Sequence, residues 1–441
     1  MTNKYEIIQS LMRFTLILAA FLSQPSIAET SAIPRLIVHA SLSSPSLPII
    51  LRGSKLASLL GERLSRIHAI TNHGGTIEAI PFQIDQRDAK GRYVLTVKDA
   101  GSNPKLDAND EFVFMVSDAG NQISTIPGQT AIEIAITDPQ TKEPKWVYIV
   151  ESMSAENLPT SGKPHVTYDP TRNAIETSTY RIAFSTAQPF LIDSLQWHTD
   201  GPNKWSQNMV DTMKVRHYGK LFGDIDFTRT QADYKSRVVA VKEGPVRVIR
   251  RTLNSVRVIW YLQSPSVNID YVVYANGFQM DTTIDFPFPL GWFFSDVSTL
   301  TTIDWNDDPS LPALRIYGAE MRNGISVNGR MTPEKELFNR NAGQRFAIES
   351  SYGLALVSLE IEKNLPIAGR LYLQDDKMSA DEPENVPGQF GNVGFITTGW
   401  EKVDASIHHL LLNAIFLPKT TMEQGIRVLG DKPWSRPSET Q

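Results

Sequence analysis

The sequence predicts a mainly β protein with few helices, because short strand-like runs recur along its whole length. TAIEIAIT (130–137), SVRVIWYLQ (255–263) and VNIDYVVYANG (267–277) are apolar or alternate between apolar and polar residues, and a period of two is typical of strands. Clusters of Gly, Asn, Asp, Ser and Pro separate many such runs, as the turns of antiparallel hairpins require. We therefore expect mostly antiparallel sheets.

Two segments are the best candidates for helices, GSKLASLLGERLSRI (53–67) and TPEKELFNRNAG (332–343). In the second, Thr332 suits the N-cap and Pro333 the first helical position. Glutamates at positions 334 and 336 place negative charge in the first turn, where the helix dipole favours it. We expect a helix in both segments.

A polar segment rich in Pro, Ser and Gly (151–173) is the best candidate for a linker. It would divide an N-terminal β-sandwich domain (32–150) from a large antiparallel β domain (174–430). The polar residues 431–441 are expected to form a tail without regular structure.

The first 28 residues have the pattern of an export signal. Lys4 and Arg13 precede or border the apolar run FTLILAAFLS, and Ser26-Ile27-Ala28 places small residues where a signal peptidase needs them. Ten apolar residues are too few to cross a hydrocarbon core of roughly 30 Å. We expect residues 1–28 to be a cleaved signal peptide, the mature chain to have no membrane span, and the protein to be periplasmic or secreted.

Composition excludes several classes of function. The chain has no cysteine, which removes thiol catalysis, Cys-ligated zinc and iron–sulfur clusters. Its net charge is −5, with 43 basic and 48 acidic residues interspersed, so we expect no nucleic-acid partner.

An acidic stretch raises the question of a metal site. Calcium prefers carboxylate and amide oxygens, and the candidate ligands are Asp85, Asp107, Asn109 and Glu111. An EF-hand is excluded, because Phe112 takes the loop position that needs glycine. A calcium site at the edge of a sandwich stays open beside the simpler interpretation, in which these residues form Asx-rich turns leading into a buried strand.

The segment 194–229 is the best catalytic candidate. Aromatic rings that cover the face of a sugar, together with charged groups that bond its hydroxyls, are typical of sugar sites. Lyase chemistry on uronic acids needs a base and a cation that stabilises the enolate. The candidate catalytic residues are His198, Arg216, His217 and Tyr218, and the candidate substrate-binding residues are Trp197, Lys204 and Trp205. The alternative is that these side chains only pack on a half-buried sheet.

Two further clusters need structural interpretation. The segment 286–310 contains six aromatic residues and several aspartates, which predicts either core closure or an exposed binding surface. His408 and His409 lie in a strand-like run, so we expect them to point to opposite faces and to share no metal.

Some motifs resemble those of a known group of proteins. In the first half, LPIILRGSKL, AIPFQID and LDANDEFVFMVSDAG resemble a pattern of exported β-sandwich domains that stand before mutarotase-like "supersandwich" domains. In the second half, KEGPVRVIRRT and GFITTGWEKVDASIHHLLLNAIFLP are similar to strands of those larger domains. Those proteins include polysaccharide-lyase-related and uncharacterised exported families. The resemblance implies an N-terminal β-sandwich followed by a large antiparallel supersandwich-like domain. It implies no catalytic residue.

Two functions are therefore expected. In the first, the chain is an exported protein that binds or processes a polysaccharide or oligosaccharide in a concave β groove, like a lyase or hydrolase. In the second, it is a non-catalytic periplasmic accessory protein that binds a protein partner of an envelope complex or an exported enzyme system. Fold analogy alone does not decide between them.

Overall fold

A computed structural model describes residues 33–40, 48–96, 104–124, 126, 130–138, 142–151, 158–160, 162–199, 205–318, 321–340, 343–378 and 390–418. The chain divides into two compact units, Met1–Pro34 and Arg35–Gln441, and all the sheets lie in the second. No helix within the described ranges is long and apolar enough to cross a membrane. The expected signal peptide, the expected tail and Lys204 lie outside the described residues.

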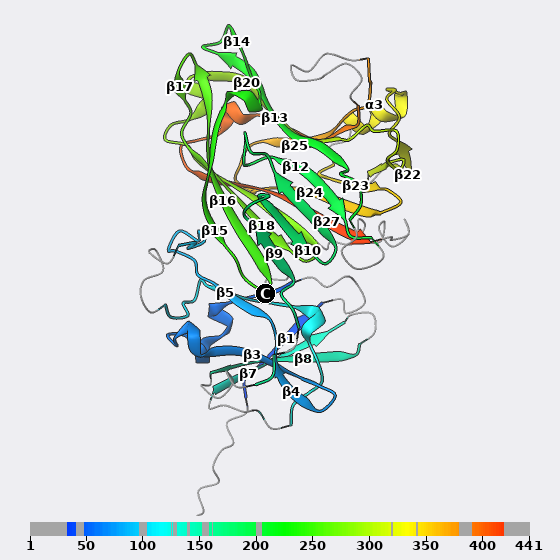
Figure 1. Ribbon diagram of the computed structural model, residues 1–441. Helices are drawn as coiled ribbons and strands as arrows, with labels where there is room; N and C mark the ends of the chain where they lie inside the picture. The colour runs from blue at the N-terminus through cyan, green and yellow to red at the C-terminus, as the bar shows by residue number, and fades with distance from the viewer. Residues whose placement is uncertain are drawn as a thin grey trace, which may run out of the picture. The chain divides into compact units, whose positions relative to one another are not determined.

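Two sheets form from the first 151 residues (Figure 1). The five-stranded sheet has the order β1-β7-β8-β3-β4 and the three-stranded sheet the order β2-β6-β5. Their buried residues, including Leu51, Phe112, Phe114, Ile134 and Ile149, form one apolar cluster, as two sheets packed face to face require. The strands are β1 (Arg35–His39), β2 (Pro48–Arg52), β3 (Ile67–His73), β4 (Thr76–Ala79), β5 (Phe82–Asp85), β6 (Glu111–Met115), β7 (Thr130–Thr137) and β8 (Pro144–Glu151).

The helix expected over 53–67 does not form, and this prediction was wrong. Three separate 3-10 turns take its place, at Gly53–Lys55, Ala57–Leu59 and Leu64–Arg66. The backbone N–H groups of Gly53, Gly61 and Leu64 donate to carbonyls of the segment 104–110, so they are not available for helical bonds. Gly61 also has a φ of 81°, which ends any right-handed helix there.

Three larger sheets form from residue 166 onward. Their orders are β12-β11-β10-β9, β14-β13-β20-β26-β25, and β15-β16-β18-β19-β27-β24-β23-β21-β22, with β17 paired to β16. We call the second the five-stranded G sheet and the third the ten-stranded H sheet. Every pair between neighbouring strands in them is antiparallel.

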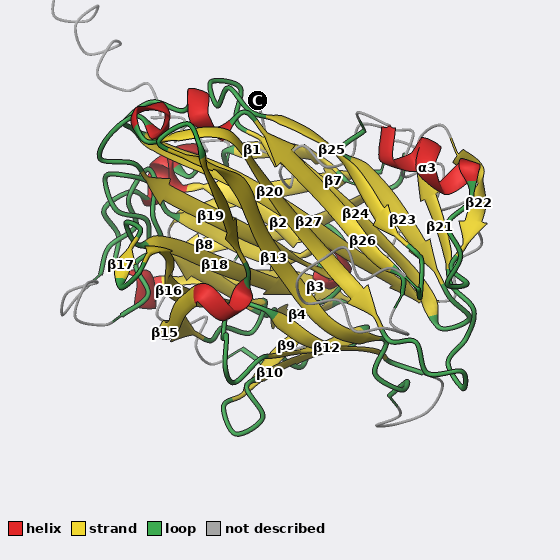
Figure 2. Ribbon diagram, turned by 90° about the horizontal axis from the view of Figure 1, so that it is seen from above, coloured by secondary structure: helices red, strands yellow, loops and turns green. Residues whose placement is uncertain are grey.

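The strands of these sheets differ in length, from two residues in β17 to thirteen in β16. They are β9 (Val166–Asp169), β10 (Ala174–Thr177), β11 (Tyr180–Phe184), β12 (Ile192–Trp197), β13 (Val210–Leu221), β14 (Ile225–Arg229), β15 (Tyr234–Lys242), β16 (Arg247–Ile259), β17 (Leu262–Gln263), β18 (Val267–Tyr274), β19 (Gly277–Asp285), β20 (Phe294–Trp305), β21 (Arg315–Gly318), β22 (Met321–Ser326), β23 (Arg345–Glu349), β24 (Gly353–Ile361), β25 (Ala368–Gln374), β26 (Asn392–Thr398) and β27 (Ile407–Pro418). Seen from above, they form a broad array with few helices (Figure 2). The mainly β fold is confirmed.

The core of this part lies between the sheets. One apolar cluster takes residues from all three, among them Trp197, Tyr271, Trp305, Phe346 and Phe416. Aromatic rings fill the space between the facing strands, with Tyr180 and Phe416 only 4.3 Å apart between centroids. Burial of such large side chains supplies most of the driving force for the packing of two sheets.

The expected second helix is confirmed as α3 (Pro333–Arg340). The hydroxyl of Thr332 accepts from the backbone N–H of Lys335, as expected of an N-cap. The ammonium of Lys335 is itself buried and binds the carboxylate of Asp375, which follows β25. This ion pair fixes the helix against the edge of the G sheet.

Candidate functional site

A cavity of about 760 Å³ lies between the G and H sheets. Its lining comes from β13, β14 and β20 of the G sheet, from β15 to β19 and β27 of the H sheet, and from the segments around Pro265, Phe286–Leu290 and Trp400. These elements converge at the end of the sandwich where β14, β17 and β20 are labelled in Figure 1. Its volume lies within the ordinary range of ligand pockets, roughly 300–1,000 Å³.

At this end of β13 and β20, many of the inward-facing side chains are of small or medium size and leave space between the sheets. On β13, Met213, Val215 and His217 alternate into the interior. Opposite them on β20, Val297, Thr299 and Thr301 do the same. At the other end of the same strands, large aromatic side chains close the gap and leave a cavity of only about 50 Å³.

A cavity of this size cannot be sealed and empty in solution. At ~24 cal/mol per Å³, an empty volume of 760 Å³ would cost about 18 kcal/mol, more than the whole stability of a typical domain, roughly 5–15 kcal/mol. Water or a ligand must therefore fill it. The walls are mostly Val, Ile, Leu, Met and Phe, which offer water few hydrogen bonds. They favour an apolar ligand.

Polar groups interrupt the apolar wall at two places. At the first, Asn254, Ser255, Gln263 and Ser264 lie on and around β16 and β17, where the hydroxyl of Ser255 donates to Oε1 of Gln263. The second is a cluster around His217. Nδ1 of the His217 imidazole lies 2.9 Å from the hydroxyl of Thr299, and Nε2 lies 2.5 Å from the hydroxyl of Tyr234. His217 comes from β13, Thr299 is its register partner on β20, and Tyr234 begins β15 on the opposite sheet. The cluster therefore joins the G and H sheets across the cavity.

The cluster carries no charge at neutral pH. Burial lowers the pKa of His217 to about 4, and burial raises the pKa of Tyr234 above its ordinary value, because each charged form would lose its hydration. The cavity reaches the imidazole, which is only half-buried by accessible surface. None of the described residues that line the cavity is an Asp, Glu, Lys or Arg.

The neutral imidazole leaves one hydroxyl proton available. Neutral histidine donates from one ring nitrogen and accepts at the other. When Nδ1–H donates to Thr299, Tyr234 donates to Nε2 and the Thr299 proton is free. In the other tautomer, Thr299 donates to Nδ1, Nε2–H donates to Tyr234, and the Tyr234 proton is free. Either way, one neutral donor remains for an acceptor oxygen of a ligand.

Of the catalytic candidates, only His217 lines the cavity. Arg216 and Tyr218 alternate to the opposite face of β13, where Arg216 is fully buried and donates to the hydroxyl of Thr302 at 3.4 Å. Lys214 shares that face and binds Asp304 of β20 at 2.7 Å. The structure therefore separates His217 from Arg216 and Tyr218. Their catalytic roles stay predictions.

The remaining candidates lie near β12. Trp197 is buried in the core, with its ring 5.6 Å from that of Phe416. His198 forms an isolated bridge with Trp205, and their rings meet edge to face at 5.2 Å. The guanidinium of Arg181 covers the ring of Trp205 at 4.8 Å. Trp205 is therefore packed between two side chains, and its sugar-binding role stays a prediction.

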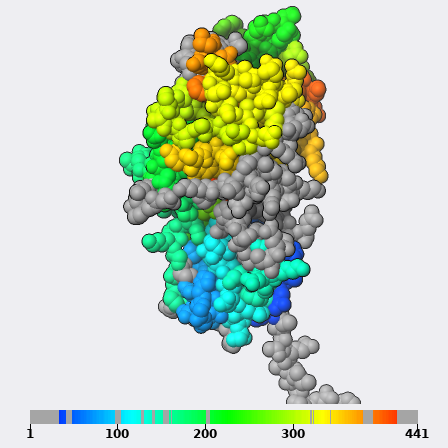
Figure 3. Space-filling model, turned by 90° about the vertical axis from the view of Figure 1, so that its right-hand side faces the viewer, coloured from blue at the N-terminus to red at the C-terminus, as the bar shows by residue number. Residues whose placement is uncertain are grey.

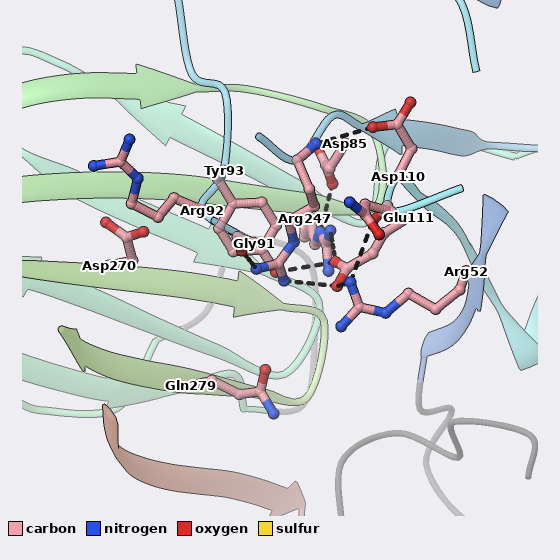
Figure 4. A network of polar contacts seen from close by, with 12 residues as sticks. Arg52, Asp85, Gly91, Arg92, Tyr93, Asp110, Glu111, Arg247, Asp270 and Gln279 are labelled. Carbon is pink, nitrogen blue, oxygen red and sulfur yellow. Dashed lines mark hydrogen bonds and ion pairs between the residues drawn. The ribbon is translucent and has the colours of Figure 1, made fainter. Parts of the chain in front are cut away.

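The acidic stretch of the first sheets forms a buried ionic network (Figure 4). The guanidinium of Arg247 on β16 donates to Asp85 and to Glu111, at 2.6 Å each. Lys242 binds Asp85 at 2.8 Å, and Arg87 binds Glu111 at 2.6 Å. Burial raises the pKa of both carboxyls, but these cations outweigh it and hold both values below the ordinary range.

The turn interpretation of the same stretch is also visible. The carboxylate of Asp110 accepts from the backbone N–H groups of Asp107 and Arg87, at 2.8 and 2.9 Å. No group of three His, Asp or Glu side chains in the described part of the chain is placed to hold a metal. Calcium binding by Asp85, Asp107, Asn109 and Glu111 stays a prediction, and an ion there would compete with arginine and lysine for two of its ligands.

Sequence reasoning missed most of the cavity. It singled out His217, but not its partners Tyr234 and Thr299. The signal it could have used is the aromatic segment 286–294, which lines the cavity through Phe286, Phe288 and Phe293. His408 and His409 lie on opposite faces of β27 as expected: His408 is 4 % exposed, and the side chain of His409 is 42 % exposed.

Comparisons with known proteins give distant similarities. No protein-family model matches the chain, and its sequence matches no curated protein. Among solved structures, it is similar to an α-mannosidase from Enterococcus faecalis V583, with 9 % identity over 87 % of this chain and a TM-score of 0.43. A galactose mutarotase-related enzyme from Lactobacillus acidophilus shows 11 % identity over 56 % of this chain and 97 % of its own, with a TM-score of 0.31.

A glycosyl hydrolase family 38 protein from Enterococcus faecalis is similar over 87 % of this chain, with 9 % identity and a TM-score of 0.42. The chain spans only 42 % of the length of the mannosidase and 44 % of that of the family 38 protein. Every one of these TM-scores is below 0.5.

Proposed function

We propose that this chain, as an exported protein, binds an elongated, mostly apolar molecule with an uncharged oxygen group in the cavity between the G and H sheets. The observation that carries the proposal is a mostly apolar cavity of about 760 Å³ in which the polar cluster of His217, Tyr234 and Thr299 is neutral. A long-chain alcohol, ester or ketone fits that chemistry. The cluster would hold its oxygen, and the apolar walls its chain.

The same chemistry disfavours charged or highly hydroxylated ligands in this cavity. An ionised carboxylate would lose its hydration and find no cation among the described lining residues. A sugar ring would bury several hydroxyl groups against Val, Ile and Phe side chains, and each unpaired hydroxyl is costly. Selectivity for apolar, uncharged molecules therefore follows from the walls themselves.

A displacement titration tests the proposal. The uncharged fluorophore N-phenyl-1-naphthylamine is bound to the purified protein and then displaced with hexadecanol, methyl palmitate, palmitate and a panel of oligosaccharides. We expect the alcohol and the ester to displace it, the ionised acid to bind at least about tenfold more weakly, and the oligosaccharides to have no effect.

A matched pair of variants locates the binding. Val258→Trp fills the cavity from β16, and Val238→Trp adds the same ring at an exposed position on neighbouring β15. We expect only Val258→Trp to weaken binding of the fluorophore. Equal binding by both variants, or no binding by the wild type, would contradict the proposal.

A second candidate function rests on buried polar side chains on the face of the G sheet that points away from the cavity. Arg216 and Lys214 lie there beside Asp304. The buried Asn392 has two polar side-chain atoms, Oδ1 and Nδ2, and neither has a hydrogen-bond partner among the described residues. Burial raises the pKa of Asp304 despite Lys214 and Arg216. A carboxyl with a raised pKa beside two cations is the combination that the predicted processing of acidic polysaccharides would use.

Polysaccharide digestion tests this second function. Wild type and Asp304→Asn are incubated with uronic-acid and neutral polysaccharides, and unsaturated or reducing ends are measured. We expect product from the wild type and at least about a hundredfold less from Asp304→Asn. A wild type that forms no product on any polymer would remove the candidate without affecting the cavity proposal.

A further inference from the structure

A group of large apolar side chains stands exposed around the cavity mouth. Trp260 is 78 % exposed, Tyr261 87 % and Trp292 70 %. Folded proteins seldom leave such rings in water side by side, because each loses the free energy that burial would give. We name the group the aromatic rim: Phe222, Trp260, Tyr261, Leu262, Trp292 and Phe293.

The rim is continuous with the cavity. The backbone N–H of Phe222 donates to the carbonyl of Phe293 at 2.8 Å, and the two rings lie 6.0 Å apart between centroids. Phe222, Leu262 and Phe293 are exposed and also line the cavity. The rim therefore surrounds an opening that leads from the surface into the apolar interior.

Three separate turns contribute to the rim. Phe222 lies between β13 and β14, Trp260 and Tyr261 lie between β16 and β17, and Trp292 lies in the 3-10 turn Leu290–Trp292 before β20. In Figure 3, the green part of the chain, which contains the β13–β14 turn, projects at the top of the view. Turns at the ends of strands usually carry Gly, Asn or Asp rather than aromatic residues.

The backbone makes this choice of residue more unusual. Phe222 and Trp260 have φ values of 54° and 47°, a left-handed conformation that bulky residues rarely adopt. Their exposed rings gain little from packing in return. Strain held at an exposed position is typical of functional sites.

We propose that the aromatic rim docks on the interface of a lipid bilayer, and that the ligand of the cavity passes between the bilayer and the cavity through the opening inside the rim. This inference rests on the proposed function. Trp and Tyr prefer the membrane–water interface, where the ring is apolar and the N–H or O–H stays hydrated. Phe222 and Leu262 would enter the acyl boundary, as the apolar residues of interfacial proteins do.

The charges around the rim favour a membrane surface without strong net charge. Asp224 and Asp226 follow Phe222 and are exposed, whereas Arg257 near Trp260 is paired with Asp233. Charges of both signs therefore border the rim, so apolar burial must supply the binding free energy. We expect binding to zwitterionic vesicles that changes little with salt.

Vesicle flotation tests the inference. The full chain is mixed with phosphatidylcholine vesicles, and we expect the wild type to float with them. The triple variant Trp260→Ser, Tyr261→Ser, Trp292→Ser removes three rim rings that do not line the cavity. It should partition at least about tenfold less into vesicles, while its affinity for hexadecanol in solution stays equal to that of the wild type.

The control variant carries the same kind of change elsewhere. Ile37→Ser, Leu337→Ser, Met378→Ser replaces three exposed apolar side chains outside the rim, and it should float like the wild type. Lipids brominated in their acyl chains should quench tryptophan fluorescence in the control and not in the triple rim variant.

The outcomes separate the two proposals. A wild type that binds hexadecanol but stays unbound to vesicles overturns docking and leaves the cavity function standing. A wild type that floats but binds no apolar ligand overturns the cavity function instead. If light scattering shows a dimer that the rim variant dissociates, and vesicles do not compete with it, the rim is a contact between copies and not a membrane surface.

Discussion

Arg247 and Asp85 are 162 positions apart in the sequence and form a fully buried ion pair, with Nε 2.6 Å from Oδ2. The same guanidinium also binds Glu111 and stands beside the rings of Tyr93 and Tyr274. Three motifs noticed in the sequence, PFQID, DEFVF and KEGPVRV, thus meet at one residue. Their shared role is to join the first sheets to the end of β16.

Loss of the arginine should destabilise the whole chain. Arg247→Ala leaves Asp85 and Glu111 buried without their main partner, and an uncompensated buried charge costs about 3–5 kcal/mol. We expect a lower midpoint of urea unfolding, measured by tryptophan fluorescence. Arg172→Ala, which removes an exposed partner of Asp169, should leave the midpoint nearly unchanged. An equal effect of both variants would contradict a structural role for the network.

The same network predicts acid sensitivity. Because the pKa values of Asp85 and Glu111 are lowered in the folded chain, their contribution to stability is fully present above the unfolded values of roughly 4. It is lost as pH falls through the lower folded values. We expect the urea midpoint of the wild type to fall below about pH 4, measured in a pH series. Arg247→Met should flatten this dependence.

Close packing at Gly244 tests the contact between Gln83 of β5 and the start of β16. A Cβ atom there would lie 2.1 Å from Oε1 of Gln83, which accepts from the backbone N–H groups of Val246 and Arg247. Gly244→Ala must displace that oxygen and lose both bonds, at a cost of about 1–3 kcal/mol. Glu243→Ala, at the exposed neighbouring position, is the control. Thermal unfolding that does not distinguish the two variants would show that Gln83 moves freely.

His217 predicts a second pH dependence, at higher pH than the carboxylates. Its folded pKa of about 4 is below the unfolded value of roughly 6.5. Between these values the unfolded chain binds the extra proton, so stability falls as pH decreases from about 6.5 to 4, by up to roughly 3 kcal/mol. His217→Gln should lose this part of the pH dependence. Nitrogen NMR should show a neutral imidazole at pH 6, and an imidazolium signal there would contradict the assignment.

Tyr234→Phe tests the polar cluster by ligand selectivity. The change removes one of the two hydroxyls that pair with His217 and keeps the ring that lines the cavity. We expect hexadecanol to bind about five- to tenfold more weakly, because a hydrogen bond contributes roughly 1 kcal/mol. Hexadecane, which has no oxygen, should bind as it does to the wild type. A parallel loss for both ligands would mean that the hydroxyl acts on structure alone.

The sequence predicts the strands well because burial patterns are local. The run LALVSLEI corresponds to β24, and TAIEIAIT to β7. The segment 53–67 fails for the opposite reason: its backbone bonds go to residues about fifty positions away, which no local pattern records. β9 similarly begins at Val166, within the range expected as a linker, because its partner strand β10 follows directly.

The candidate site is harder to predict than the fold. One wall of the cavity is formed by side chains of β13 and β20, two neighbouring strands that are far apart in the sequence: His217 and Thr299 are 82 positions apart. Only the register of the two strands brings them together. The sequence does show that His217 and the aromatic segment 286–294 are unusual. It does not show that both line the same cavity.

A ligand bound in the proposed cavity would also stabilise the fold. A molecule that occupies it replaces missing core contacts, so the loaded chain should melt at a higher temperature, by about 2.7 kcal/mol of added stability at a hundredfold excess over Kd. An unloaded chain would open more often and be cut sooner by proteases. Its resistance to proteolysis would then depend on whether the cavity is occupied.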